Sequence, residues 1–230
     1  MVNKMIPVGQ FFFKWRNLLF PLIVICIYIA IRPSVEVFSI QGIIALVIIT
    51  LGILIRMSVI GFFNVVRDGD KKTAHADELF TRGMFGISRN TLYLGNLTTY
   101  FGIFLLHGAP LALVIGFAVF VFIYYSIIFS EESFLRGKFG AGFETYVSEV
   151  PRLLPKLGNW SKATSGMAFS WKRAIFSEYN IIGQSILMVL LVIWYKSYLA
   201  SGSMVLPLTS LVLLAGGVVF MLTIRTIKRR

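Results

Sequence analysis

The sequence has little charge, almost no histidine and a single cysteine. Only 14% of its 230 residues are charged, which is too few to cover the surface of a soluble domain of this length. Cys26 stands alone, so the chain can form neither an internal disulfide nor a cysteine metal site. His75 and His107 lie far apart and show no ligand spacing. The soluble and disulfide-bonded classes are therefore not favoured, and no metal site is expected.

Long apolar runs take the place of this missing charge, since 57% of the residues are hydrophobic. A helix that spans a membrane needs about 20 predominantly apolar residues. The pattern predicts an all-α, polytopic membrane protein with about six transmembrane helices, in which the first and third blocks are the shortest. The six blocks are residues 17–31, 37–62, 92–106, 110–129, 179–195 and 204–224.

The charge that is present is strongly basic, with 22 Lys and Arg against 10 Asp and Glu and a net charge of +12. In so apolar a chain, basic loops are more typical of contact with anionic lipid than of nucleic-acid binding. The lipid bilayer is the expected partner, and no nucleic acid is expected. Basic segments alternate with the six blocks, which predicts both termini on the cytoplasmic side of a bacterial inner membrane. Arg56 is the exception, because it lies inside a block.

A short connection joins the third and fourth apolar blocks. Gly108 suits the end of one helix and Pro110 the start of the next, so residues 106–110 predict a tight helical hairpin. The far ends of these two helices must then lie close together at the cytoplasmic surface. Glu131 and Glu132 follow the fourth block, and at a helix C-terminus they would oppose the helix dipole. An acid so near the membrane is a functional hypothesis by default.

Two segments on either side of this hairpin carry a motif. The first has the form Thr-x-Gly-x-Phe followed by Arg-x-x-x-Tyr-x-Gly, and the second has Glu-Glu-x-x-Leu followed by Phe-Gly and a final Val-Pro-Arg. Together they resemble the isoprenylcysteine carboxyl methyltransferase family and its bacterial and phospholipid-methyltransferase relatives, over about residues 77–156. The matching residues are Thr81, Gly83, Phe85, Arg89, Tyr93, Gly95, Glu131, Glu132, Leu135, Phe139, Gly140, Phe143, Tyr146, Val150, Pro151 and Arg152.

The resemblance implies a methyltransferase that uses S-adenosylmethionine (AdoMet) at the cytoplasmic face, with a lipophilic acceptor that arrives through the bilayer. It divides the chain into N-terminal helices (1–62), a methyltransferase-like core (63–160) and a linker with a C-terminal helix pair (161–230). Glu132, as general base, and Arg89 are the expected catalytic residues. The expected cofactor-binding residues are Asp77, Glu78, Leu79, Phe80, Phe85, Asn90, Thr91, Leu92, Tyr93 and Glu131.

Two departures from the family pattern bear on the acceptor. Asn90 and Thr91 stand where the family has His-Pro, and Ile127 stands where prenylcysteine enzymes have an arginine that orients the acceptor carboxylate. A lipid headgroup with an amine, hydroxyl or thiol is therefore as compatible with the sequence as a prenylcysteine, and we predict an acceptor other than a prenylcysteine carboxylate. An NADPH-dependent membrane reductase of related fold and a non-enzymatic membrane protein are the alternatives.

Overall fold

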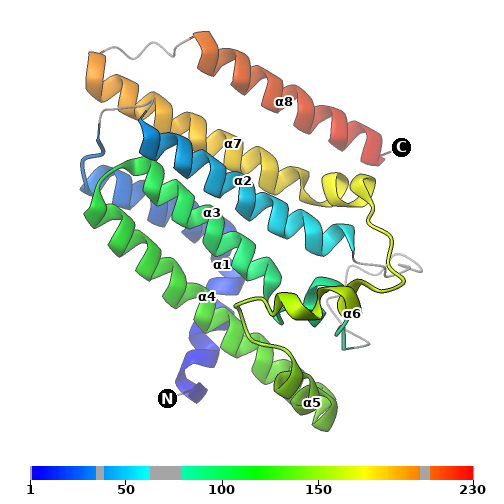
Figure 1. Ribbon diagram of the computed structural model, residues 1–230. Coiled ribbons are helices and arrows are strands. Elements are labelled where there is room, and N and C mark those ends of the chain that lie inside the picture. Colours follow the sequence, from blue (N-terminus) through cyan, green and yellow to red (C-terminus); the bar gives the residue numbers. More distant parts are fainter. Residues whose placement is uncertain (1, 35–38, 63–78, 203–207, 230) are drawn as a thin grey trace.

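The computed structural model describes residues 2–34, 39–62, 79–202 and 208–229, and these residues form an all-helical bundle (Figure 1). Helix makes up 84% of the structure, and the described residues contain no strand. The predicted all-α class is confirmed. The long helices are α1 (Val2–Ala30), α2 (Ile40–Gly61), α3 (Thr91–His107), α4 (Pro110–Phe139), α7 (Trp171–Ser201) and α8 (Leu208–Arg229). Shorter elements are η1 (Gly83–Gly86), α5 (Ala141–Glu149), η2 (Leu157–Asn159) and α6 (Trp160–Thr164).

Each of the six long helices overlaps one of the six predicted apolar blocks. Among the described residues, four helices are long and apolar enough to cross a membrane: Met5–Ala30, Ile40–Gly61, Pro110–Phe139 and Trp171–Ser201. Helix α3 has 17 residues, fewer than the about 20 that a span perpendicular to the bilayer needs. The protein is therefore a membrane protein with four candidate spans, and the arrangement of six spans stays a prediction.

The predicted hairpin between α3 and α4 is confirmed. Helix α3 ends at His107, Gly108 follows with a positive φ of 90°, and Pro110 is the first residue of α4. Glycine suits this position because it has no Cβ to clash in the left-handed region. Residues 31–34 and the end of α7 lie beside this turn, since Ser34 donates its N–H to the His107 carbonyl and Lys196 donates to the Ser34 hydroxyl. We call this the hairpin end of the bundle.

The opposite end, here called the loop end, gathers the connections that carry the motif. Gly61 accepts a hydrogen bond from the N–H of Ser170, and Pro151 accepts one from the N–H of Arg89. The first bond joins the end of α2 to the start of α7, and the second joins the start of α3 to the segment after α5. Helix α1 begins near the late turns of α4, and α8 ends beside the start of α7, so both ends of the described chain lie toward this side (Figure 1). Its orientation toward the cytoplasm stays a prediction.

One expectation about α4 was wrong. Glu131 and Glu132 do not end the helix, because α4 continues through Phe139 and stops only at Gly140, where φ is 50°. The last turn carries Arg136 and Lys138, which suit the negative end of a helix dipole. The two acids therefore lie within a helix, and the predicted dipole penalty does not apply to them.

Helices α2 and α3 approach each other closely through glycine. A Cβ added at Gly95 would lie 2.8 Å from the Gly52 carbonyl oxygen, and one added at Gly52 would lie 2.7 Å from the backbone nitrogen of Thr99. Small residues at such crossings let backbones pack closely in membrane bundles. On the other side of α3, an aromatic core joins it to α1 and α4, through Phe20, Tyr100, Phe120 and Tyr124.

Candidate functional site

A cavity of about 660 Å³ runs from the loop end into the bundle. Residues from Asn90 to Ile103 of α3 form one wall, which corresponds to about 20 Å along a helix that rises 1.5 Å per residue. Helices α1, α2, α4, α5 and α7 and the segment before α3 supply the other walls. The cavity is thus long enough for two ligands placed end to end along α3.

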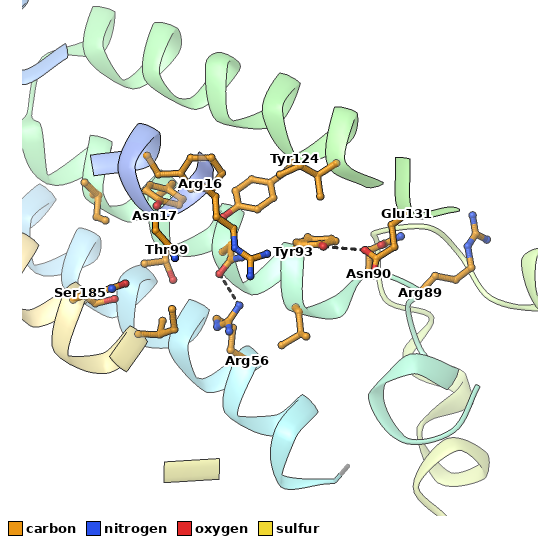
Figure 2. Close-up of a pocket in the computed structure, with 18 of the residues that line it drawn as sticks. Arg16, Asn17, Arg56, Arg89, Asn90, Tyr93, Thr99, Tyr124, Glu131 and Ser185 are labelled. Atoms are coloured by element: carbon orange, nitrogen blue, oxygen red, sulfur yellow. Dashed lines mark hydrogen bonds between the residues drawn. The ribbon is translucent and has the colours of Figure 1, made fainter. Parts of the chain in front are cut away.

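The cavity has two parts, which differ in the helices that line them. We call the part at the loop end the mouth; it is lined by Leu79, Phe80, Phe85, Asn90, Tyr93, Glu131, Leu135, Phe143 and Tyr146. We call the deeper part the inner chamber; its polar lining is Arg16, Asn17, Arg56, Asn96, Thr99, Gln184 and Ser185. Figure 2 shows Arg56, Thr99 and Ser185 on one side and Asn90 and Glu131 on the other, with Tyr93 between them.

Glu132 is the centre of a buried ion cluster beside the mouth. Its side chain is 5% exposed and accepts hydrogen bonds from Arg89 at 3.0 Å and from Arg152 at 2.9 Å. The Asn90 amide lies 3.4 Å from the same carboxylate and donates to the Arg152 carbonyl at 3.0 Å. Two guanidinium groups therefore compensate one carboxylate, and together they fasten the start of α3 to α4 and to the segment after α5.

Arg89 also holds the end of α5. Its guanidinium donates to the carbonyls of Val147 and Val150 as well as to Glu132. A guanidinium carries several N–H donors in a rigid plane, so one buried arginine can fix several chain segments at once. The side chain of Arg89 is 7% exposed. Its contacts make it the main link between the two motif segments.

Glu131 lies next in sequence but in a different environment. It is exposed to the cavity, and its carboxylate accepts a hydrogen bond of 2.9 Å from the Tyr93 hydroxyl. The bond joins α3 to α4 across the mouth, where Figure 2 draws it as a dashed line. The mouth therefore presents one carboxylate whose charge no described cation offsets by direct contact.

Tyr146 closes the side of the mouth that α5 supplies. Burial raises the pKa of Tyr146 well above its ordinary value, so the hydroxyl keeps its proton. It donates this proton to the Phe85 carbonyl at 2.7 Å. This bond fixes the backbone of the η1 turn, which brings the Phe85 side chain to the cavity wall.

Nine of the twelve predicted site residues line this one cavity. They are Leu79, Phe80, Phe85, Arg89, Asn90, Leu92, Tyr93, Glu131 and Glu132. Thr91 does not line it, because its buried hydroxyl lies 3.0 Å from the Met84 carbonyl and 2.9 Å from that of Ser88. Asp77 and Glu78 lie outside the described residues. Thr91 thus holds the turn before α3, where proline stands in the family pattern.

The departure at Ile127 lies directly on the cavity. Ile127 is 2% exposed and lines the wall, so no cation occupies the position of the family arginine. Arg89 and Arg152 are the nearest alternatives in the motif, and Glu132 engages both of them. Neither of these two motif arginines is therefore free to bind an acceptor carboxylate.

The inner chamber contains residues that sequence reasoning missed. Arg56 of α2 forms a two-point ion pair with Glu178 of α7, at 2.7 and 3.0 Å, and donates to the Asn96 amide oxygen at 2.8 Å. Arg56 was visible in the sequence as a charge within an apolar block. Its partner was not, because Glu178 is 122 positions away and precedes another block. Arg16, Gln184 and Ser185 gave no signal beyond their polarity.

The comparisons with known proteins agree with the motif. Residues 38–142 match the family model described as phospholipid methyltransferase. Neither the search of curated proteins nor the search of solved structures found a match. The matched region contains α2, η1, α3, α4 and the first residues of α5, and so includes the hairpin with Arg89, Tyr93, Glu131 and Glu132. Residues 38–142, a little under half of the chain, therefore match the phospholipid methyltransferase family.

Proposed function

We propose that this protein is an integral membrane methyltransferase that binds AdoMet in the mouth and methylates an amine on a lipophilic acceptor. The observation that carries the proposal is the cavity, which brings nine residues of the two motif segments together and continues from the loop end into the apolar bundle. The family match over residues 38–142 supports the methyltransferase activity. The cofactor and the acceptor are our inferences.

The mouth fits the chemical character of AdoMet. A cavity of about 660 Å³ is within the usual size range of small-molecule sites. Phe80, Phe85 and Tyr93 offer aromatic faces, which favour the adenine ring and a positively charged sulfur. Glu131 offers a carboxylate for the ammonium group of the methionine part. When bound, AdoMet supplies a methyl group on a positively charged sulfur, and the protein needs mainly to align the reactants and exclude water.

The charges around the mouth favour an amine acceptor over a carboxylate. A carboxylate would bring a negative charge beside Glu131, and like charges a few ångströms apart repel strongly where the effective dielectric constant is low. Ile127 supplies no cation, and Glu132 occupies both Arg89 and Arg152. A neutral amine creates no such repulsion, so we infer an acceptor other than a prenylcysteine carboxylate.

The geometry favours a positioning role for Glu132 and Arg89. The sequence suggests Glu132 as general base, but its two oxygens already accept hydrogen bonds from two guanidinium groups. A carboxylate whose two oxygens are both engaged by guanidinium groups is suited to holding chain segments together. We therefore assign Glu132 and Arg89 to fixing the start of α3, which brings Asn90 and Tyr93 to the mouth.

Two measurements on purified protein test the proposal. Calorimetry should detect binding of AdoMet and none of NADPH, which separates a methyltransferase from the reductase alternative. A methyl-transfer assay with labelled AdoMet should then show turnover on a membrane lipid extract and little on a farnesylcysteine analogue. Robust turnover of the analogue with none on lipid would contradict the proposed acceptor. Absence of AdoMet binding by the folded protein would contradict the proposed cofactor.

A further inference from the structure

The segment between α5 and α7 combines positive charge with exposed apolar side chains. Residues 150–177 include five basic residues and no acidic one. The same stretch exposes four large apolar side chains by between 43% and 76%, namely those of Leu154, Leu157, Trp160 and Trp171. We call residues 152–173 the basic strap, and Figure 1 shows it running from α5 past α6 to the start of α7. Lysines among exposed leucines and tryptophans are typical of a surface that contacts lipid headgroups.

The basic strap lies at the level where two candidate spans end. Ser170 donates its N–H to the carbonyl of Gly61, the last residue of the candidate span in α2. Trp171 is the first residue of the candidate span in α7. The ring of Trp160 packs edge-on against that of Phe62, which directly follows α2, with 6.0 Å between the centroids. Because tryptophan prefers the boundary between acyl chains and water, these contacts place the strap at the headgroup level of a bilayer.

The lysines of the basic strap have no ion-pair partner among the residues that the structure describes. Lys156, Lys162 and Lys172 are exposed, and no described carboxylate lies within ion-pair distance of them. Arg136 of α4 is also exposed but is paired with Glu144. Lys172 lies in the first turn of α7, which has no acidic residue, so its charge adds to the positive end of the helix dipole. An anionic surface would offset both charges.

The backbone of the basic strap also holds the turn before α3. Lys156 donates its N–H to the Ile87 carbonyl at 3.0 Å, and the Asn159 side chain donates to the Gly86 carbonyl at 3.3 Å. These carbonyls belong to η1 and the residue after it, and Phe85 of η1 lines the mouth. The segment that exposes lysine, leucine and tryptophan side chains therefore also fixes one wall of the mouth.

We propose that the basic strap docks on the headgroups of anionic lipid, and that this contact steadies the turn that carries Phe85. The lysines attract the negative leaflet, while the leucines and indoles enter the boundary of the acyl chains. The link to the mouth rests on the proposed function, since it makes cofactor affinity depend on the charge of the leaflet. The strap begins after the family match ends at residue 142, so the match does not imply this surface.

Fluorescence quenching tests the docking on the full-length protein in nanodiscs whose lipid chains are brominated. A bimane label is attached to the exposed position of Ser161→Cys in a Cys26→Ser background. Quenching should be at least about twofold stronger in discs with about 30% phosphatidylglycerol than in phosphatidylcholine alone, because the charged surface draws the strap to the acyl chains. The difference should vanish in about 1 M salt, where the screening length is about 3 Å. Equal quenching in the two discs would overturn the proposal, and no quenching in either would assign the surface to a partner in water.

Matched variants show whether the lysines of the basic strap cause the effect. Lys156→Gln combined with Lys162→Gln should abolish the difference in quenching between the two discs. Lys14→Gln combined with Lys138→Gln removes the same charge from exposed lysines of α1 and α4, and should leave the difference unchanged. A persistent difference in the first variant, or an equal loss in the second, would overturn the proposal.

Binding of S-adenosylhomocysteine separates the docking from the proposed function. This compound lacks the sulfonium charge of AdoMet, so an anionic surface does not concentrate it by attraction alone. In the parent, its dissociation constant should be at least about twofold lower in the discs with phosphatidylglycerol, and the strap variant should lose this gain. Lipid-dependent quenching with an unchanged dissociation constant would overturn the link to the mouth. Such quenching without binding of either cofactor form would contradict the proposed function and leave the docking intact.

Discussion

The two ends of this bundle both bury polar groups, but they use them differently. At the hairpin end, Lys196 is 2% exposed and donates to the Leu106 carbonyl, and His107 is fully buried with its Nε2 2.9 Å from the Ile31 carbonyl. Neither residue lines the cavity. At the loop end, the cluster of Glu132, Arg89 and Arg152 borders the cavity and joins side chain to side chain. Burial of charge therefore does not by itself indicate a site; the position of the cavity does.

The largest effect should come from breaking the cluster at the loop end. Glu132→Ala leaves Arg89 buried without its carboxylate, and such a loss costs about 3–5 kcal/mol of unfolding free energy. Denaturant unfolding in detergent measures this change. Glu144→Ala is the control, because its ion pair with Arg136 is about half exposed and contributes at most about 1 kcal/mol. Similar losses in the two variants would show that the cluster is not the anchor that its contacts indicate.

A change at the hairpin end should alter stability and leave ligand binding intact. Lys196→Met removes the hydrogen bonds to the Leu106 carbonyl and the Ser34 hydroxyl, which should lower the unfolding free energy by about 1.5–3 kcal/mol. The dissociation constant for AdoMet should stay that of the parent, since no part of the mouth touches this end. A weaker affinity for AdoMet would mean that the two ends are coupled, against the comparison drawn above.

A substitution in the mouth should have the opposite effect, weakening ligand binding and leaving stability nearly unchanged. Glu131→Ala should weaken AdoMet binding by about 1–3 kcal/mol, the scale for losing a charged hydrogen-bond partner, with little change in unfolding free energy. The comparison of the dissociation constant with kcat distinguishes two roles for this carboxylate. If only kcat fell, Glu131 would act on the proton that the acceptor loses. That result would contradict the proposed contact of Glu131 with the ammonium group of the cofactor.

Tyr93→Phe should give the smallest energetic effect. It deletes one hydroxyl that donates to Glu131 and keeps the aromatic face, so AdoMet binding should weaken by only about 0.5–1.5 kcal/mol. Tyr93→Ala, which removes the ring as well, should weaken it by about 1–3 kcal/mol, because contacts of the ring with the cofactor are lost as well. Equal affinities in the two variants would show that the ring makes no contribution.

The orientation of the bundle in the membrane can be tested by cysteine labelling. In a Cys26→Ser background, Ala200→Cys places a thiol at the hairpin end and Ser165→Cys places one at the loop end, both at exposed positions. A membrane-impermeant reagent added outside intact cells should label the first variant and not the second, because the basic loops predict a cytoplasmic loop end. The reverse labelling would contradict the predicted orientation.

Local patterns in the sequence predicted much of this architecture. The Gly108 and Pro110 signals placed the hairpin correctly, and the motif spacing identified nine residues that share one cavity. The end of α4 was missed because the apolar run stops at Phe129, whereas the helix continues through a charged segment to Phe139. Hydropathy reports where a helix leaves the apolar layer and gives no information about where its hydrogen bonding ends.

The inner chamber could not be predicted because its contacts join distant parts of the chain. Arg56 and Glu178 are 122 residues apart, and each looked like an isolated charge near an apolar block. Arg56 lies inside a predicted span, whereas Glu178 lies just before one, so no pattern in the sequence indicated that the two form a pair. Arg16 resembled an ordinary basic residue at the start of a membrane helix, and only the packing of α1 against α4 brings it to the cavity.

The glycine at position 95 has a consequence for any redesign of this protein. A Cβ at Gly95 would lie 2.6 Å from Cγ of Arg56, so the bare backbone of a motif residue sets how close the arginine of α2 can come. Gly95 follows Tyr93 by two residues and precedes Asn96, which orients the same arginine. One turn of α3 therefore sets the distance between the mouth and the inner chamber. An engineer who wishes to reshape the cavity must keep position 95 without a side chain, or must move α2 away from α3.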